Sequence, residues 1–100
     1  MLSDNICIWN WDGHTILDKY GNCINPAEDI FIGDHVWIGM NASVSKGARI
    51  PSNSVVGQKS LVTHSFNEEG VILAGIPAKV VRKEISWDRT PSSIWKQNNF

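Results

Sequence analysis

The chain has 100 residues, of which 42% are hydrophobic and 19% are charged, and its formal net charge at pH 7 is -1. This length suits one domain with a small core, and the near-neutral charge gives no electrostatic basis for binding nucleic acid or an anionic membrane. No apolar run is long enough to span a bilayer, and the N-terminus lacks the layout of a signal peptide. We therefore expect a cytoplasmic protein without membrane insertion, whose two cysteines, Cys7 and Cys23, are free thiols.

The first predicted element lies before residue 12. Leu2, Ile6 and Ile8 fit a first coil of the repeat that follows later in the chain. Residues 12-26, DGHTILDKYGNCINP, contain two glycines, two asparagines and a proline, which are typical of a loop. We therefore expect this segment to leave the regular structure as an excursion.

A period of six dominates the middle of the chain, where an aliphatic residue occupies every sixth position: Ile32, Ile38, Val44, Ile50, Val56 and Val62. A helix turns by 100° per residue and would scatter these positions, whereas six is a multiple of two and keeps them on one face of an extended chain. The residues four positions further on share this inward parity and are mostly small: Val36, Ala42, Ala48, Ser54, Ser60 and Phe66. The residues two positions further on are mostly polar, so we expect the chain to bend there. The positions directly after each aliphatic residue are rich in glycine, which tolerates tight backbone geometry.

Three successive hexads, about 18 residues, would complete one triangular coil. In such a coil Ile32 stacks against Ile50, Ile38 against Val56, and Val44 against Val62. The spacing thus predicts an all-β fold, a parallel β-helix. The strands of a β-sandwich would also alternate inward-facing and outward-facing residues, but they would not keep a fixed spacing without insertions.

After the hexads the register breaks. The segment HSFNEEG, residues 64-70, is expected to form a turn or loop. Residues 71-85, VILAGIPAKVVRKEI, predict a last strand, a turn at residues 75-77 and an amphipathic extended tail.

The C-terminal residues predict a short helix, because Thr90 is a suitable N-cap and Pro91 suits the first helical position. We expect one domain over residues 1-100. It would have coils over about 2-67, the loop at about 12-26, and a closing strand and tail over 71-100.

The motifs DGHTI, DIFIGDHVWIG and AGIPAKVVRKEISWDR, with the hexads between them, resemble those of the hexapeptide-repeat acyltransferase family. The resemblance extends from about Asp12 to Arg89 and points to the branch that O-acetylates sugars and capsular polysaccharides. It implies a left-handed β-helix, an exception to the usual right-handed crossover. It also implies a homotrimer that binds acetyl-CoA in a groove between neighbouring subunits and transfers the acetyl group to a sugar or polysaccharide hydroxyl.

Two residues match the catalytic positions of that family. His14 corresponds to the loop histidine that acts as general base, and a neutral imidazole can accept the hydroxyl proton. Either Asp12 or Asp18 could orient its ring, and the sequence does not choose between them. Trp37 corresponds to the tryptophan of VWIG, which would wall the thioester end of the groove, donate a hydrogen bond, or fill a trimer interface.

Further positions match residues that line the coenzyme groove in the family: Met40, Gln58, Thr63, His64, Ala74, Gly75, Lys79 and Arg82. Lys79 and Arg82 are expected to meet phosphates, with an ordinary solvated basic face as the alternative. Ala74 and Gly75 would let the coenzyme pass closely. His64 stands where the family usually has lysine, which would weaken a phosphate contact at neutral pH.

The remaining histidine, His35, is expected to be only solvated. Zinc carbonic anhydrases share this fold but use a close histidine pair, and the three histidines here are 21 and 29 residues apart, so we expect no metal. Members of the acyltransferase family are typically longer, and the chain resembles the C-terminal half of one. A truncated, catalytically idle trimeric β-helix module is therefore the alternative to an active enzyme.

Overall fold

The computed structural model describes residues 1-99, with side chains as far as Trp95. Within these residues the chain forms nine short strands and one C-terminal helix. Their bounds are β1 (Cys7–Trp9), β2 (Phe31–Ile32), β3 (Trp37–Ile38), β4 (Ser43–Ser45), β5 (Arg49–Ile50), β6 (Val55–Val56), β7 (Leu61–Val62), β8 (Ile72–Gly75), β9 (Ala78–Arg82) and α1 (Ser92–Asn99). The predicted all-β class is confirmed.

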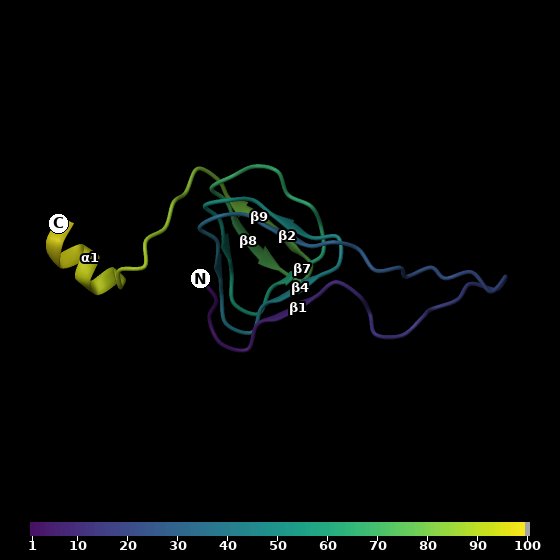
Figure 1. Cartoon of the computed structure of the whole chain (residues 1–100). Helices are drawn as coiled ribbons and strands as arrows, with labels where there is room; N and C mark the ends of the chain where they lie inside the picture. The colour runs from purple at the N-terminus through teal and green to yellow at the C-terminus, as the bar shows by residue number, and fades with distance from the viewer. Residues whose placement is uncertain (100) are drawn as a thin grey trace.

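The strands stack in three ladders that form the sides of a coil with a triangular outline (Figure 1). The ladders run β1-β4-β7, β2-β5 and β3-β6-β8-β9, and every pair except β8-β9 is parallel. The three stacks predicted from the period are all present: Ile32 with Ile50, Ile38 with Val56, and Val44 with Val62. The hexad period is therefore the stacking repeat of a parallel β-helix.

The core is a single column of side chains inside the coils. It contains Val36, Ile38, Ala42, Val44, Ala48, Ile50, Val56, Val62, Val71, Leu73 and Ala78. Two serines are buried among them, and both hydroxyls accept hydrogen bonds from the last coil. Val71 N donates to Ser54 Oγ at 3.2 Å, and Gly75 N donates to Ser60 Oγ at 3.1 Å. The small residues that were predicted to point inward, Ala42, Ala48, Ser54 and Ser60, are all buried inside the coils.

The coil bends at the polar positions predicted for it, two residues after each aliphatic residue, and each bend includes the following residue. The residues in the left-handed conformation come three positions after the aliphatic ones: His35, Asn41, Gly47, Asn53 and Lys59. The glycines one position after the aliphatic residues serve close approach instead. A Cβ on Gly39 would lie 2.8 Å from both Gln58 N and Val56 O in the next coil. Glycine is needed there because the neighbouring backbone occupies the space of a side chain.

The predicted loop is an insertion in the first complete coil. Ile8 pairs with Val44, 36 residues later, which is twice the stacking repeat. The additional residues form an arm that projects far from the coil (Figure 1). At its base, Glu28 N donates to Asn10 O at 3.0 Å. Leu17 and Cys23 pair antiparallel within the arm.

The C-terminal part of the fold is more ordered than the predicted extended tail. Leu73 of β8 pairs with Val56, continuing the coil after the turn at residues 64-70. After Pro77 the chain reverses, and β9 pairs antiparallel with β8. Buried Ala78 and half-buried Val80 then close the end of the core.

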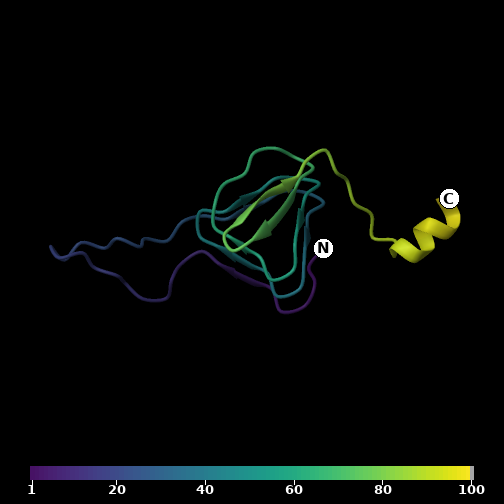
Figure 2. The ribbon, with the colours of Figure 1, turned by 180° about the vertical axis from the view of Figure 1, so that it is seen from behind.

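The predicted terminal helix is confirmed as α1, which lies on the opposite side of the coil from the loop (Figure 2). Its first acceptor is Pro91 O, which receives a hydrogen bond from Trp95 N at 3.0 Å, so the helix begins one residue later than predicted. No helix in the described part of the chain is long and apolar enough to cross a membrane.

Candidate active site

A pocket of about 340 Å³ opens where the outer face of β3 and β6 meets the next bend. It is lined by Ser3, Trp37, Gly39, Met40, Val55, Val56, Gly57 and Gln58. Trp37, which was predicted to be catalytic, therefore lies together with Met40 and Gln58, which were predicted to line the coenzyme groove. Their spacing explains this, because Met40 and Gln58 occupy the same bend in successive coils. We call this bend the pocket corner (residues 39-42 and 57-60).

Two glycines and one tryptophan line the pocket where β3 and β6 end. Gly39 and Gly57 sit directly after β3 and β6, and Trp37 stands beside them with 36% of its surface exposed. Trp37 Nε1 donates to Ser3 Oγ at 3.3 Å, which ties the indole to the N-terminal segment. The result is an apolar slot with one aromatic wall.

The last coil extends this slot toward β9. A Cβ on Gly57 would lie 3.3 Å from Ala74 Cβ, so Ala74 is the next residue along the corner. Gly75 follows it, and Lys79 on β9 is the register partner of Ala74. Arg82 lies further along β9, opposite Ile72. The predicted small residues and exposed cations thus continue from the pocket in one strip.

Thr63 and His64 do not join this strip within one chain. They follow β7 at the other end of the β1-β4-β7 side, near the corner from which the loop leaves the coil. The backbone oxygen of His64 accepts a hydrogen bond from Arg49 N at 3.2 Å. We call this bend the loop corner (residues 45-48 and 63-64). The residues predicted for a single groove therefore occupy two corners of the same chain.

Asn25 organises the loop that carries His14. Its Nδ2 donates to His14 O at 2.8 Å and to Asp12 Oδ2 at 2.9 Å, while its Oδ1 accepts from Ile16 N at 2.6 Å. One side chain thus joins both limbs of the arm and holds the backbone of His14. The sequence does not indicate this role, because an asparagine before a proline predicts only a turn.

Neither candidate carboxylate orients the His14 ring. Lys46 Nζ donates to Asp12 Oδ2 at 2.8 Å, and this bond, with that from Asn25, lowers the pKa of Asp12. The backbone amides of Asn22 and Tyr20 donate to Asp18 and lower its pKa. In the part of the chain whose side chains are described, the exposed His14 ring makes no hydrogen bond.

His35 is not merely solvated, contrary to the prediction. Its ring stacks on Trp87 with centroids 3.9 Å apart and planes 3° from parallel. Trp87 Nε1 also donates to His35 O at 2.8 Å, and the Trp87 ring contacts Trp37 at a tilt, with centroids 6.0 Å apart. The tryptophan of ISWDR had no assigned role because no periodicity extends to it.

No family model matches the chain, but individual proteins resemble it over most of its length. A polysialic acid O-acetyltransferase of Escherichia coli O1:K1 is 38% identical over 91 residues, which is 90% of this chain. The crystal structure of the polysialic acid O-acetyltransferase OatWY superposes with a TM-score of 0.85 and 40% identity over 89% of this chain. The chain is homologous to hexapeptide-repeat O-acetyltransferases.

A hexapeptide-repeat acetyltransferase of Vibrio cholerae, solved with acetyl-CoA, also matches, with a TM-score of 0.65 and 26% identity over 78% of this chain. The handedness follows from these neighbours: the coils form the left-handed parallel β-helix of hexapeptide-repeat acetyltransferases. The chain spans less than half of each relative, namely 29% of the Escherichia coli protein, 43% of OatWY and 42% of the Vibrio cholerae protein.

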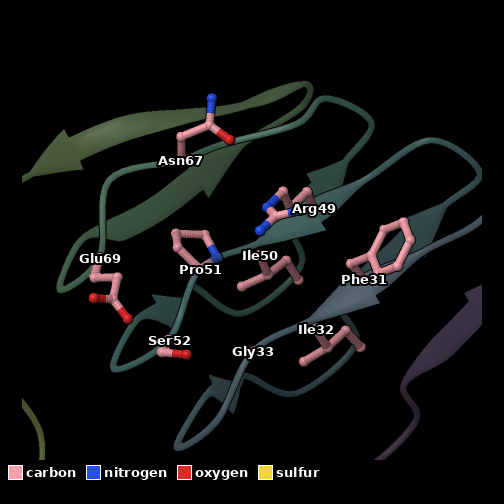
Figure 3. Close-up of a pocket in the computed structure, with 9 residues that line it drawn as sticks. All are labelled: Phe31, Ile32, Gly33, Arg49, Ile50, Pro51, Ser52, Asn67 and Glu69. Atoms are coloured by element: carbon pink, nitrogen blue, oxygen red, sulfur yellow. The ribbon is translucent and has the colours of Figure 1, made fainter.

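This O-acetyltransferase homologue has a second pocket, of about 380 Å³, on the outer face of β2 and β5 (Figure 3). The guanidinium of Arg49 lies 5.9 Å from the centroid of the Phe31 ring at one end, and Asn67 and Glu69 stand at the other. None of the predicted site residues lines it. Among the described residues, no group of three or more His, Cys, Asp or Glu side chains could hold a metal ion.

Proposed function

We propose that the chain is an acetyl-CoA-dependent O-acetyltransferase that acts on a hydroxyl group of a sugar or polysaccharide. The observation that carries this proposal is the strip that runs from Trp37 through Met40 and Gln58 to Gly75 and Lys79. It occurs in a chain homologous to polysialic acid O-acetyltransferases, so an acidic polysaccharide of that type is the proposed acceptor. The exposed, unpaired Cys7 and Cys23 suit the reducing cytoplasm, where we place the reaction.

The strip suits the shape and charge of acetyl-CoA as a substrate. Its glycines and Ala74 admit a thin, extended chain close to the backbone, and the apolar lining beside Trp37 suits the thioester end. The exposed Lys79 and Arg82 offer cations to the phosphates at the other end. The complex of the Vibrio cholerae relative with acetyl-CoA supports this assignment.

His14 is proposed as the general base. Its neutral imidazole takes the proton of the acceptor hydroxyl while the hydroxyl oxygen attacks the thioester carbonyl carbon. A nearby donor stabilises the tetrahedral oxyanion, and Trp37 Nε1 is a candidate because its bond to Ser3 is long, at 3.3 Å. When the carbon–sulfur bond breaks, His14 returns the proton to the departing thiolate. An acetyl ester and free coenzyme A result.

We propose a homotrimer because the site is incomplete in one chain. The His14 loop leaves one corner of the β1-β4-β7 side, and the pocket corner lies at the other end of that side. The loop and the residue before it also expose large apolar side chains: Trp11, Ile16, Leu17, Tyr20 and Ile24. Such surface is typical of a protein interface. A neighbouring loop would bring His14, with Thr63 and His64 of its own chain, to the pocket.

Calorimetric titration of the full chain with coenzyme A tests the proposal. A charge-assisted hydrogen bond to phosphate is worth about 1.5–3 kcal/mol, so Lys79→Ala and Arg82→Ala should each raise Kd about 10-fold or more, most strongly at low salt. Lys83→Ala is the matched control, because this exposed lysine pairs with Glu68 at 3.4 Å. A folded chain that binds no coenzyme A would contradict the proposal and favour an idle β-helix module.

A further inference from the structure

The segment after β9 is a strap that crosses the coils. Ile85 N donates to Gly70 O at 2.9 Å beside the last coil, and Trp87 Nε1 donates to His35 O at 2.8 Å. Gly70 and His35 belong to different coils of the same corner, because Gly70 N bonds Ser52 O and Asn53 N bonds Asp34 O. Residues 85-87 therefore connect the last coil of the β-helix to the bend that precedes β3, and β3 lines the pocket.

Trp87 is the only strap residue among those described whose ring contacts aromatic rings of the coils. It lies flat on His35, whose Nδ1 is 3.3 Å from Asn53 Oδ1, so the ring beneath it is held from its edge. The same indole reaches Trp37 at 6.0 Å and 46°. This separation and tilt are within the favourable range for aromatic pairs.

We propose that Trp87 is a positioning residue for the pocket, acting through Trp37. Trp37 is the aromatic wall of the pocket, and its Nε1 donates a hydrogen bond to Ser3. The tilted Trp87 ring adds an aromatic contact to the Trp37 ring system and so fixes the direction of the wall. This inference rests on the proposed function for its effect on acetyl transfer, but the pairing of the two indoles can be measured alone.

Two substitutions separate the contributions of Trp87, and a third acts from the other side. Trp87→Ala removes both the ring and the hydrogen bond, whereas Trp87→Phe keeps a ring that can stack. His35→Asn removes the supporting ring at a residue with a φ of 52°, a conformation that asparagine tolerates. Arg89→Ala, at an exposed residue two positions further on, is the matched control.

The experiment combines circular dichroism with coenzyme A calorimetry and acetyl-transfer kinetics. A pair of indoles 6.0 Å apart should give an exciton-coupled signal, lost equally in Trp87→Ala and Trp37→Ala. Aromatic pairs contribute about 2- to 12-fold to an equilibrium constant, so Trp87→Ala should raise the coenzyme A Kd by such a factor. It should also lower kcat. Trp87→Phe should recover most of both losses, His35→Asn should reproduce them in part, and Arg89→Ala should show neither.

The outcomes separate the inference from the function on which it rests. A wild-type chain with the exciton signal but no coenzyme A binding contradicts the proposed function and not the pairing. If Trp87→Ala loses the signal while Kd and kcat stay unchanged, Trp87 does not position the pocket. If that variant fails to fold, His35→Asn still decides, because wild-type Kd and kcat in this variant would overturn the inference.

Discussion

Gly39 and Gly57 occupy equivalent places in successive coils, and the structure predicts opposite tolerance of alanine. A Cβ on Gly39 would lie 2.8 Å from two backbone atoms, Gln58 N and Val56 O. Neither atom can move without separating the stacked coils. A Cβ on Gly57 would meet the side chains of Ala74 and Ser60 at 3.3 and 3.4 Å, which small local shifts accommodate. Neither glycine has a positive φ, so the difference is one of space alone.

Overpacking of this kind costs about 1–3 kcal/mol, and we expect Gly39→Ala at or above the upper end because it strikes backbone. Replacing glycine by alanine also stabilises a compatible site by about 0.4–1 kcal/mol through the unfolded state, which should leave Gly57→Ala near neutral. A difference of about 2 kcal/mol corresponds to roughly 8–16 °C in Tm for a domain of this size. Thermal unfolding followed by circular dichroism at equal protein concentration measures it. Equal Tm values for the two variants would refute the coil spacing.

The structure supports three further predictions. Ile38→Asp places an unpaired charge at a fully buried position and should lower the free energy of unfolding by about 3–5 kcal/mol. An unchanged midpoint of urea unfolding would contradict the placement of Ile38 in the core. Lys46→Ala should leave the coils stable but speed hydrogen exchange in residues 12-26, because Lys46 ties Asp12 to the base of the loop. Hydrogen bonds from Lys46 and Asn25 lower the pKa of Asp12 below its ordinary value of 3.8, so this tie is present at neutral pH. The difference between the variant and the wild type should fade as pH falls through the lowered value, and a difference that persists in acid would exclude the ion pair as its cause. Light scattering should give three times the chain mass of 11.1 kDa, and a stable monomer at micromolar concentration would refute the trimer.

The coil itself follows from the sequence because its repeat is a geometric constraint. Positions six apart must share a face of an extended chain, so Ile38 and Val56 could be paired before any coordinates were known. The pocket residues Met40 and Gln58 were predicted from the resemblance to a known family, and the register explains why they lie together. The ion pair between Lys46 and Asp12 of the loop is not encoded in this register.

The remaining features depend on contacts that no period encodes. Trp87 meets His35 only because the chain reverses after β8 and then crosses the corner. Asn25 meets His14 because the two limbs of an irregular arm lie side by side. The left-handed bend at Lys59 had no signal either, since lysine carries no preference for that conformation. The orientation of His14 toward an acceptor stays a prediction, because in the proposed trimer it depends on a neighbouring subunit.

The release of free thiol from acetyl-CoA in the presence of acidic oligosaccharide acceptors tests the proposed function most directly. It should be compared between the wild-type chain and His14→Ala, with Lys19→Ala in the same loop as the control. General-base catalysis contributes about 10²–10⁴-fold, so His14→Ala should lose turnover by that factor while its coenzyme A Kd stays at the wild-type value. Full turnover by His14→Ala on an accepted oligosaccharide would remove His14 as the base. Coenzyme A binding without transfer to any acceptor in the wild-type chain would contradict the O-acetyltransferase assignment for this chain.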